Sequence, residues 1–211
     1  MLINNIELIL NLNIIAIIEC LMESLKLYMI LLGAKPLGRN TEQHDVFFGI
    51  AKEMKDLVSD IQEFWPDGNK SLHIDAWREV NYVNGYLIKI QPKQASLNKL
   101  VEGPINKLYF INLGGYKERE FEEFHYKMLI ICDSKSQSVS QAKQTAFYKH
   151  TGFKGAPSHI DDKYGIDVDD IFEIQDILNE KYKALYSIEI SSTSSLEEDD
   201  LHLGYQLLKK L

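Results

Sequence analysis

Short apolar runs separated by polar turns set the pattern of the chain. Residues 26–33 form such a run and end in a glycine, which is typical of a buried strand. Between residues 54 and 65 the apolar side chains recur at helical spacing and Pro66 follows, so we expect a helix that ends there. Asn84-Gly85 lies between two further apolar runs and predicts a hairpin, because both turn residues accept a positive φ.

The same pattern recurs later in the chain. An apolar run that ends in glycine and a Glu-x-His motif both reappear after 81 residues, and a His-Ile-Asp motif reappears after 86 residues. A common offset over two motifs, with no gap between them, indicates an internal duplication. The matched segments are Leu27–Gly33 with Leu108–Gly114, Glu42–His44 with Glu123–His125, and His73–Asp75 with His159–Asp161.

The second copy decides between helix and strand for residues 44–51, whose own pattern fits both. At the same offset, residues 126–132 are a dense apolar run, so we expect strands in both copies. The second copy also predicts a helix over residues 138–149 and a less regular hairpin that turns at residues 168–170. Two more strands are expected near the C-terminus, over residues 186–190 and 201–208.

These elements predict an α+β fold made of two tandem β-β-α-β-β repeats. Two such units most simply pack as one pseudo-symmetric body. The chain then divides into an extra N-terminal segment (1–21), a first repeat (22–106), a second repeat (107–190), and an acidic loop with a C-terminal strand (191–211).

Residues 1–21 are rich in Ile and Leu but interrupted by Glu and Asn. A secretory signal requires basic residues near its start, but no Lys or Arg occurs before Lys26. The apolar run is also too short for a membrane span. The segment is either an amphipathic helix that packs on the body or on a partner, or lies before a true translation start at Met22. We favour the second interpretation and expect that deleting residues 1–21 leaves folding and solubility intact.

The composition narrows the class of protein. A formal net charge of −8 argues against a nucleic-acid binder and against docking on an anionic membrane, since both need a basic face. The two cysteines, Cys20 and Cys132, have no paired spacing, which fits a reducing, cytoplasmic setting and predicts neither a disulfide nor a zinc knuckle. The expected partner is a protein or a small molecule, and no cofactor or assigned metal is predicted.

Four segments together resemble the bacterial Domain of Unknown Function family DUF1543, over about residues 26–190. The resemblance implies a domain that occurs in one or two copies and begins close to the first strand. It implies no activity and therefore no catalytic residue. The segments are Met29–Gly33, Glu42–Asp45, His73–Val80 and Phe110–Tyr116, of which the second pair is the more specific.

The repeated histidines are the best candidates for a functional site. A His and an Asp two residues apart share one face of a strand. If the repeats are pseudo-symmetric, four His and two Asp could meet in one cleft between them and act as a divalent-metal set or as an acid/base pair. The alternative is that each pair ties a strand end to a loop. The candidate binding residues are His44, His73, Asp75, Trp77, His125, His159 and Asp161.

Other motifs carry less chemistry. Residues 33–39 mimic a phosphate-binding loop, but Arg39 replaces the lysine and a strand is expected to follow instead of a helix, so we expect a turn. The acidic stretch over residues 161–173 fits no calcium-loop register. Trp77 is expected on the face of His73 and Asp75, as a binding hot spot or as part of the core.

Two functions follow from these patterns. We favour a ligand- or partner-binding module without catalysis, because no complete catalytic motif is present. The alternative is a metal-dependent or acid/base enzyme with a His/Asp site between the repeats. Convergence of the repeated histidines on one open cleft would distinguish the two hypotheses.

Overall fold

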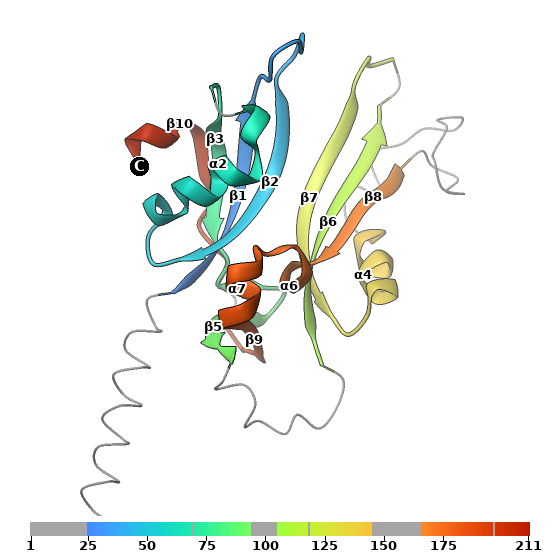
Figure 1. Cartoon of the computed structure of the whole chain (residues 1–211). Helices are drawn as coiled ribbons and strands as arrows, with labels where there is room; N and C mark the ends of the chain where they lie inside the picture. The colour runs from blue at the N-terminus through green and yellow to red at the C-terminus, as the bar shows by residue number, and fades with distance from the viewer. Residues whose placement is uncertain (1–24, 69, 94–104, 118, 145–165, 196) are drawn as a thin grey trace, which may run out of the picture.

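The computed structural model describes residues 25–68, 70–93, 105–117, 119–144, 166–195 and 197–211 (Figure 1). The described residues form a mixed α/β structure of mostly antiparallel sheets with few helices. The first sheet has the order β10-β3-β1-β2, the second β4-β5-β9 and the third β7-β6-β8. None of the described helices has the length and apolar character needed to cross a membrane.

The strands are β1 (Lys26–Ala34), β2 (Gln43–Ala51), β3 (His73–Glu79), β4 (Tyr82–Val83), β5 (Tyr86–Pro92), β6 (Lys107–Tyr116), β7 (Glu123–Cys132), β8 (Ile166–Glu173), β9 (Tyr186–Ser192) and β10 (His202–Leu207). The helices are η1 (Met54–Leu57), α2 (Val58–Phe64), η2 (Pro66–Gly68), α4 (Lys135–Ala142), α6 (Ile174–Ile177), α7 (Glu180–Leu185) and η3 (Leu208–Lys210).

The expected strands and helix of the first half are confirmed. β1 and β2 form an antiparallel hairpin, joined by the turn that mimics a phosphate-binding loop. The predicted helix divides into η1 and α2, whose Leu57 and Ile61 are fully buried. Asn84 (φ 49°) and Gly85 (φ 80°) make the expected turn between β4 and β5.

The third sheet repeats the register of the first. Gly33 pairs with His44 across the β1–β2 hairpin, and Gly114 pairs with His125 across the β6–β7 hairpin. Each central strand also has one register shift against its other neighbour, between Leu31 and Leu32 in β1 and between residues 112 and 113 in β6. α4 follows β7 but begins at Lys135, three residues earlier than expected, and residues 145–149 of the predicted helix lie outside the described residues.

The second predicted hairpin is wrong. β8 continues through residues 168–170 with a register shift that leaves Asp169 unpaired, and an edge strand tolerates such charged residues. After β8 the chain forms α6 and α7, and β9 then pairs with β5 of the second sheet. The predicted strands at residues 186–190 and 201–208 are confirmed as β9 and β10.

The inner faces of the first and third sheets pack against each other at their base. Phe48 of β2 and Phe110 of β6 meet edge to face with ring centroids 5.4 Å apart. The helices α2 and α4 cover the outer faces of the two sheets (Figure 1). β2 and β7 diverge from this base, so the inner faces are open toward the ends that carry the β1–β2 and β6–β7 turns (Figure 1).

Candidate functional site

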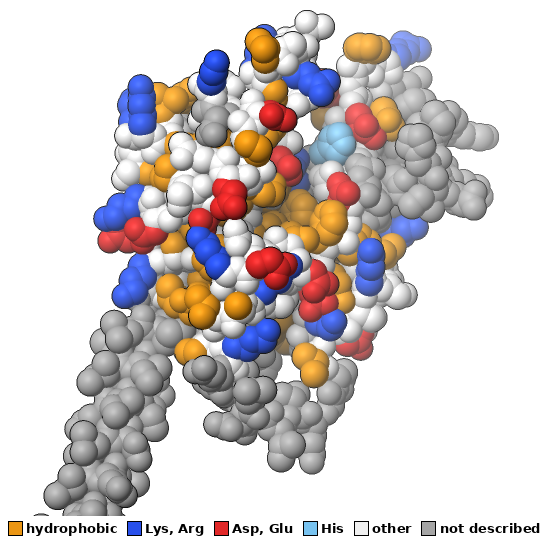
Figure 2. Space-filling model, in the orientation of Figure 1, with side chains coloured by type: hydrophobic (Ala, Val, Ile, Leu, Met, Phe, Trp, Pro, Cys, Tyr) orange, Lys and Arg blue, Asp and Glu red, His pale blue; other side chains and the backbone are white. Residues whose placement is uncertain are grey.

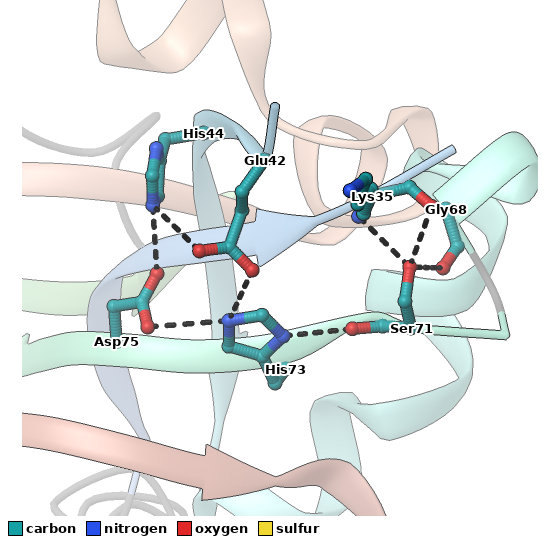
Figure 3. A network of polar contacts seen from close by, with 7 residues as sticks. All are labelled: Lys35, Glu42, His44, Gly68, Ser71, His73 and Asp75. Atoms are coloured by element: carbon teal, nitrogen blue, oxygen red, sulfur yellow. Dashed lines mark hydrogen bonds and ion pairs between the residues drawn. The ribbon is translucent and has the colours of Figure 1, made fainter. Parts of the chain in front are cut away.

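Two imidazoles and two carboxylates meet at the turn end of the first sheet. We call Glu42, His44, His73 and Asp75 the imidazole–carboxylate cluster (Figure 3). The strand register brings the histidines together, because His44 on β2 and His73 on β3 both pair with Gly33 on the strand between them. Residues far apart in the sequence therefore converge on one side of β1.

The four side chains form a closed ring of contacts. Asp75 lies between the histidines, with Oδ1 3.3 Å from His73 Nε2 and Oδ2 3.3 Å from His44 Nε2. Glu42 lies between them on the other side, with Oε1 3.3 Å from His73 Nε2 and Oε2 3.7 Å from His44 Nε2. Each Nε2 atom thus faces two carboxylates.

One backbone contact fixes the tautomer of His73. Its Nδ1 lies 2.7 Å from the carbonyl oxygen of Ser71, and a carbonyl can only accept, so Nδ1 carries a hydrogen. The Ser71 hydroxyl in turn accepts from the backbone N–H of Lys35 at 2.8 Å, which ties the entry of β3 to the end of β1 (Figure 3). The proton on Nδ1 leaves Nε2 to face the carboxylates.

A β-bulge places Asp75 in the cluster. Leu31 pairs with Ala76 and Leu32 pairs with Ile74, so Asp75 is the extra residue and has no partner on β1. The bulge shifts the alternation of β3, and Trp77 consequently lies on the opposite face, against Tyr28 and stacked on His202 at 3.8 Å. The prediction that Trp77 shares the face of His73 and Asp75 is wrong for this reason.

The cluster differs in exposure from one half to the other. The His73 side chain is 4% exposed and that of Asp75 is 25% exposed, whereas His44 and Glu42 are 44% and 46% exposed. Asp75 Oδ2 is buried and has no hydrogen-bond partner. As the side chains stand, no three His, Cys, Asp or Glu residues of the described segments are close enough together to hold a metal ion.

Gly33 makes room for the cluster. A Cβ atom at this position would lie 2.5 Å from both Asp75 Oδ2 and His73 Nε2, closer than any stable contact allows. The requirement for glycine is therefore steric, and any larger residue would displace the two best-buried members of the cluster.

A cleft of about 850 Å³ opens between the first and third sheets. Figure 2 shows apolar side chains in the hollow, with acidic side chains and a histidine along its rim. His44 and His125 both line it, one from each sheet, so two of the predicted residues do share a cleft. The apolar lining is Leu31, Val46, Phe64, Phe110, Phe172 and Ile177, and the other polar lining residues are Asp45, Asn112, Lys127 and Asp170.

The polar groups of the cleft carry opposing charges. Burial lowers the pKa of the Lys127 ammonium, and the carboxylate of Asp45 partly opposes this shift. His125 Nε2 lies 4.0 Å from Glu123, which reproduces the Glu-x-His contact of the first sheet. The cleft therefore combines an apolar lining with one partly desolvated cation.

The remaining predicted residues do not meet in this cleft. His73 and Asp75 belong to the cluster beside it, and His159 and Asp161 lie outside the described residues. The strand position opposite Gly114, which corresponds to His73 opposite Gly33, is taken by Asp167. The sequence match of His159 with His73 is therefore not a match of strand positions.

Glu42, a member of the cluster, and Gly33, which leaves room for it, were not among the predicted site residues. Both belong to segments that recur after 81 residues, and this repetition was the available signal. The polar residues of the cleft had no such signal, because only the packing of two sheets brings Asn112 and Lys127 opposite His44.

The comparisons with known proteins give a partial match to one family model and a likeness to solved structures. The model of the family described as Domain of Unknown Function (DUF1543) matches residues 39–90. Among solved structures, the chain is similar to the crystal structure of protein Il1583 from Idiomarina loihiensis, with 19% sequence identity and a TM-score of 0.54 over 87% of this chain and 97% of that chain. This likeness shows a shared fold. The comparison with curated proteins found no match.

Proposed function

We propose that this protein is a cytoplasmic ligand-binding module without catalysis, built from two tandem copies of one unit, and that the cleft between the first and third sheets is its binding site. The observation that carries this proposal is the 850 Å³ cleft, lined by histidines from equivalent strand positions on two facing sheets. Its volume lies in the range of small-molecule sites, which run from about 300 to 1,000 Å³.

The duplication is supported by backbone register as well as by sequence. The Gly–His pairing recurs in both hairpins, and both central strands shift register two residues before the paired glycine. A bulge at an equivalent position is a feature that related units share and that unrelated hairpins would not be expected to reproduce.

The lining favours an amphipathic ligand with an apolar body and an acidic group. Aromatic side chains from the third sheet and α2, with aliphatic side chains from the first sheet, would contact the apolar part, and Lys127 with the two histidines would meet the acidic group. An enzyme site between the repeats has less support, because His73 and Asp75 do not line this cleft.

An anionic aromatic dye tests the proposal. Anilinonaphthalene sulfonate has an apolar body and one acidic group, and its fluorescence rises in an apolar site. We expect saturable binding to the wild-type protein and at least a fivefold loss of affinity in Asn112→Trp, which fills the cleft, and in Phe172→Ala, whose half-exposed ring is removed without disturbing the core.

Lys89→Trp on β5 is the matched control, since Lys89 is exposed and lies outside the cleft. It should bind the dye like the wild type. If the two cleft variants fold normally by circular dichroism and still bind the dye with wild-type affinity, the cleft is not the site.

A further inference from the structure

We propose that the imidazole–carboxylate cluster binds one divalent transition-metal ion of the Zn²⁺ class, with Glu42, His44, His73 and Asp75 as ligands. The proposal concerns a site that shares only His44 with the cleft, and it does not rest on ligand binding within the cleft. It follows from the convergence of two imidazole nitrogens and two carboxylates, from the pairwise spacing of these donor atoms, and from the buried Asp75 Oδ2, which has no hydrogen-bond partner.

The ring of contacts needs a positive charge at its centre. Because Nδ1 of His73 donates to Ser71, the neutral form of this imidazole directs a lone pair from Nε2 at carboxylate oxygens on two sides. A lone pair against two carboxylates is repulsive, and His73 is too buried for water to screen it. Either a proton on Nε2 or a metal ion bound between Nε2 and the carboxylates removes this repulsion, and the spacing of the donor atoms distinguishes the two.

Taken two at a time, the donor atoms are spaced like two ligands of one metal ion and are too far apart for charge-assisted hydrogen bonds. A charge-assisted N–H···O bond is about 2.7–2.9 Å long, whereas three of the four Nε2–oxygen distances are 3.3 Å. Two ligands of a tetrahedral zinc ion, each about 2.0–2.1 Å from the metal, lie about 3.3 Å apart. Asp75 Oδ2, which is buried without a hydrogen-bond partner, would gain a bond in such a site.

The cluster combines a fixed half with an adjustable half. His73 and Asp75 are held by the Ser71 carbonyl and by the bulge, and the hydrogen bond from Nδ1 is the outer contact that orients metal-binding histidines. His44 lies at the start of β2 and Glu42 immediately precedes this strand, and both side chains are nearly half exposed, so the solvent around them leaves room for rotation. Rotation of these two side chains is the adjustment needed to bring the ligands to coordinating distance.

The third sheet has different residue types at the backbone positions that correspond to His73 and Asp75. Asp167 is opposite Gly114, and Asp169 is the residue left unpaired by the register shift, so two aspartates stand where the first sheet has His73 and Asp75. Imidazole nitrogens favour zinc and its neighbours, whereas oxygen-rich sets favour Mg²⁺ and Ca²⁺. Of the three sheets that the structure describes, we therefore expect the first to carry the zinc-class site.

Zn²⁺ titration of the untagged, chelator-treated full chain by calorimetry tests the proposal, with Co²⁺ absorption as a second readout. We expect one equivalent of Zn²⁺ and visible Co²⁺ bands of the intensity of tetrahedral coordination. Asp75→Asn and His44→Gln should each weaken Zn²⁺ binding at least tenfold and reduce the Co²⁺ bands. Gly33→Ala should do the same, since its methyl group would enter the cluster.

His202→Gln is the control, because this histidine is exposed and stacks on Trp77 away from the cluster. Absence of Zn²⁺ binding by the wild type, or equal binding by all variants, would overturn the proposal. If Asp75→Asn does not fold, the exposed His44 decides the question. Dye binding by Asp75→Asn should match the wild type, since Asp75 does not line the cleft, so this proposal and the proposed function can fail separately.

Discussion

Replacing Tyr182 by Phe should measure how much the hydrogen bond between α7 and α2 contributes to the free energy of unfolding. Asp60 of α2 is 4% exposed and accepts hydrogen bonds from the Tyr182 hydroxyl and the Lys181 ammonium of α7. The substitution deletes one hydroxyl and keeps the buried ring, so no cavity larger than a single atom results. Burial, reinforced by the Asp60 carboxylate, raises the pKa of the hydroxyl, which therefore remains a donor at neutral pH.

The expected loss follows from the type of bond. A hydrogen bond to a charged group contributes about 1.5–3 kcal/mol, and a buried carboxylate that loses a donor is poorly compensated by Lys181, whose side chain is half exposed. For a chain of this size each kcal/mol corresponds to about 2–4 °C, so the melting temperature should fall by about 3–12 °C.

Thermal unfolding followed by circular dichroism measures this shift, and urea unfolding gives the free energy independently. Tyr205→Phe is the matched control, because Tyr205 is 65% exposed and its hydroxyl makes no comparable buried bond. It should melt within about 1 °C of the wild type. A Tyr182→Phe protein that melts together with this control would show that the hydrogen bond from the Tyr182 hydroxyl to Asp60 contributes nothing to stability.

Two further predictions concern pH and a buried carboxylate. Burial, with Glu79 nearby, raises the pKa of Tyr28 to about 12 from its usual 10. The unfolded chain therefore loses this proton at lower pH than the folded protein, and the free energy of unfolding should fall as the pH rises from 10 toward 12. The urea midpoints at pH 9 and pH 11 should differ less in Tyr28→Phe than in the wild type. Asp199 Oδ1 accepts the backbone N–H groups of Asn81 and Tyr82, both at 2.9 Å. Asp199→Ala should therefore lower the free energy of unfolding by about 2 kcal/mol or more, whereas Asp199→Asn, which keeps the acceptor, should lower it by less than half as much; equal losses in the two variants would refute this assignment.

The sequence predicted the elements whose signals are local. The β1–β2 strands, the helix after them and the Asn84-Gly85 turn each follow from apolar spacing or turn chemistry within a few residues. The segment over residues 44–51 was ambiguous by itself, and the second copy resolved it correctly as a strand.

Features that depend on pairing partners were not predictable in the same way. The bulge at Asp75 has no sequence signature, and without it the alternation of β3 puts Trp77 on the wrong face. The acidic residues of β8 were interpreted as a turn because Asp is depleted in strands, but an edge strand tolerates it.

The candidate site was predictable in its residue types but not in its place. The repeated Glu-x-His and His-x-Asp motifs selected three of the four cluster residues. These residues meet within one sheet and not at the interface between two units, because His44 and His73 both pair with Gly33 on the strand between them. Only His44 and His125 among the described candidates reach the interface.

The pairing of the C-terminal strands has a consequence for synthesis on the ribosome. β9 pairs with β5 and β10 pairs with β3, so His202 lies opposite Trp77, which is translated 125 residues earlier. Because the chain leaves the ribosome with its N-terminal side first, the outer edges of β3 and β5 stay unpaired until β9 and β10 have left the exit tunnel. Open strand edges are templates for pairing with other chains. The nascent protein is therefore exposed to misassembly along β3 and β5 until the segment that carries β9 and β10 has been synthesised.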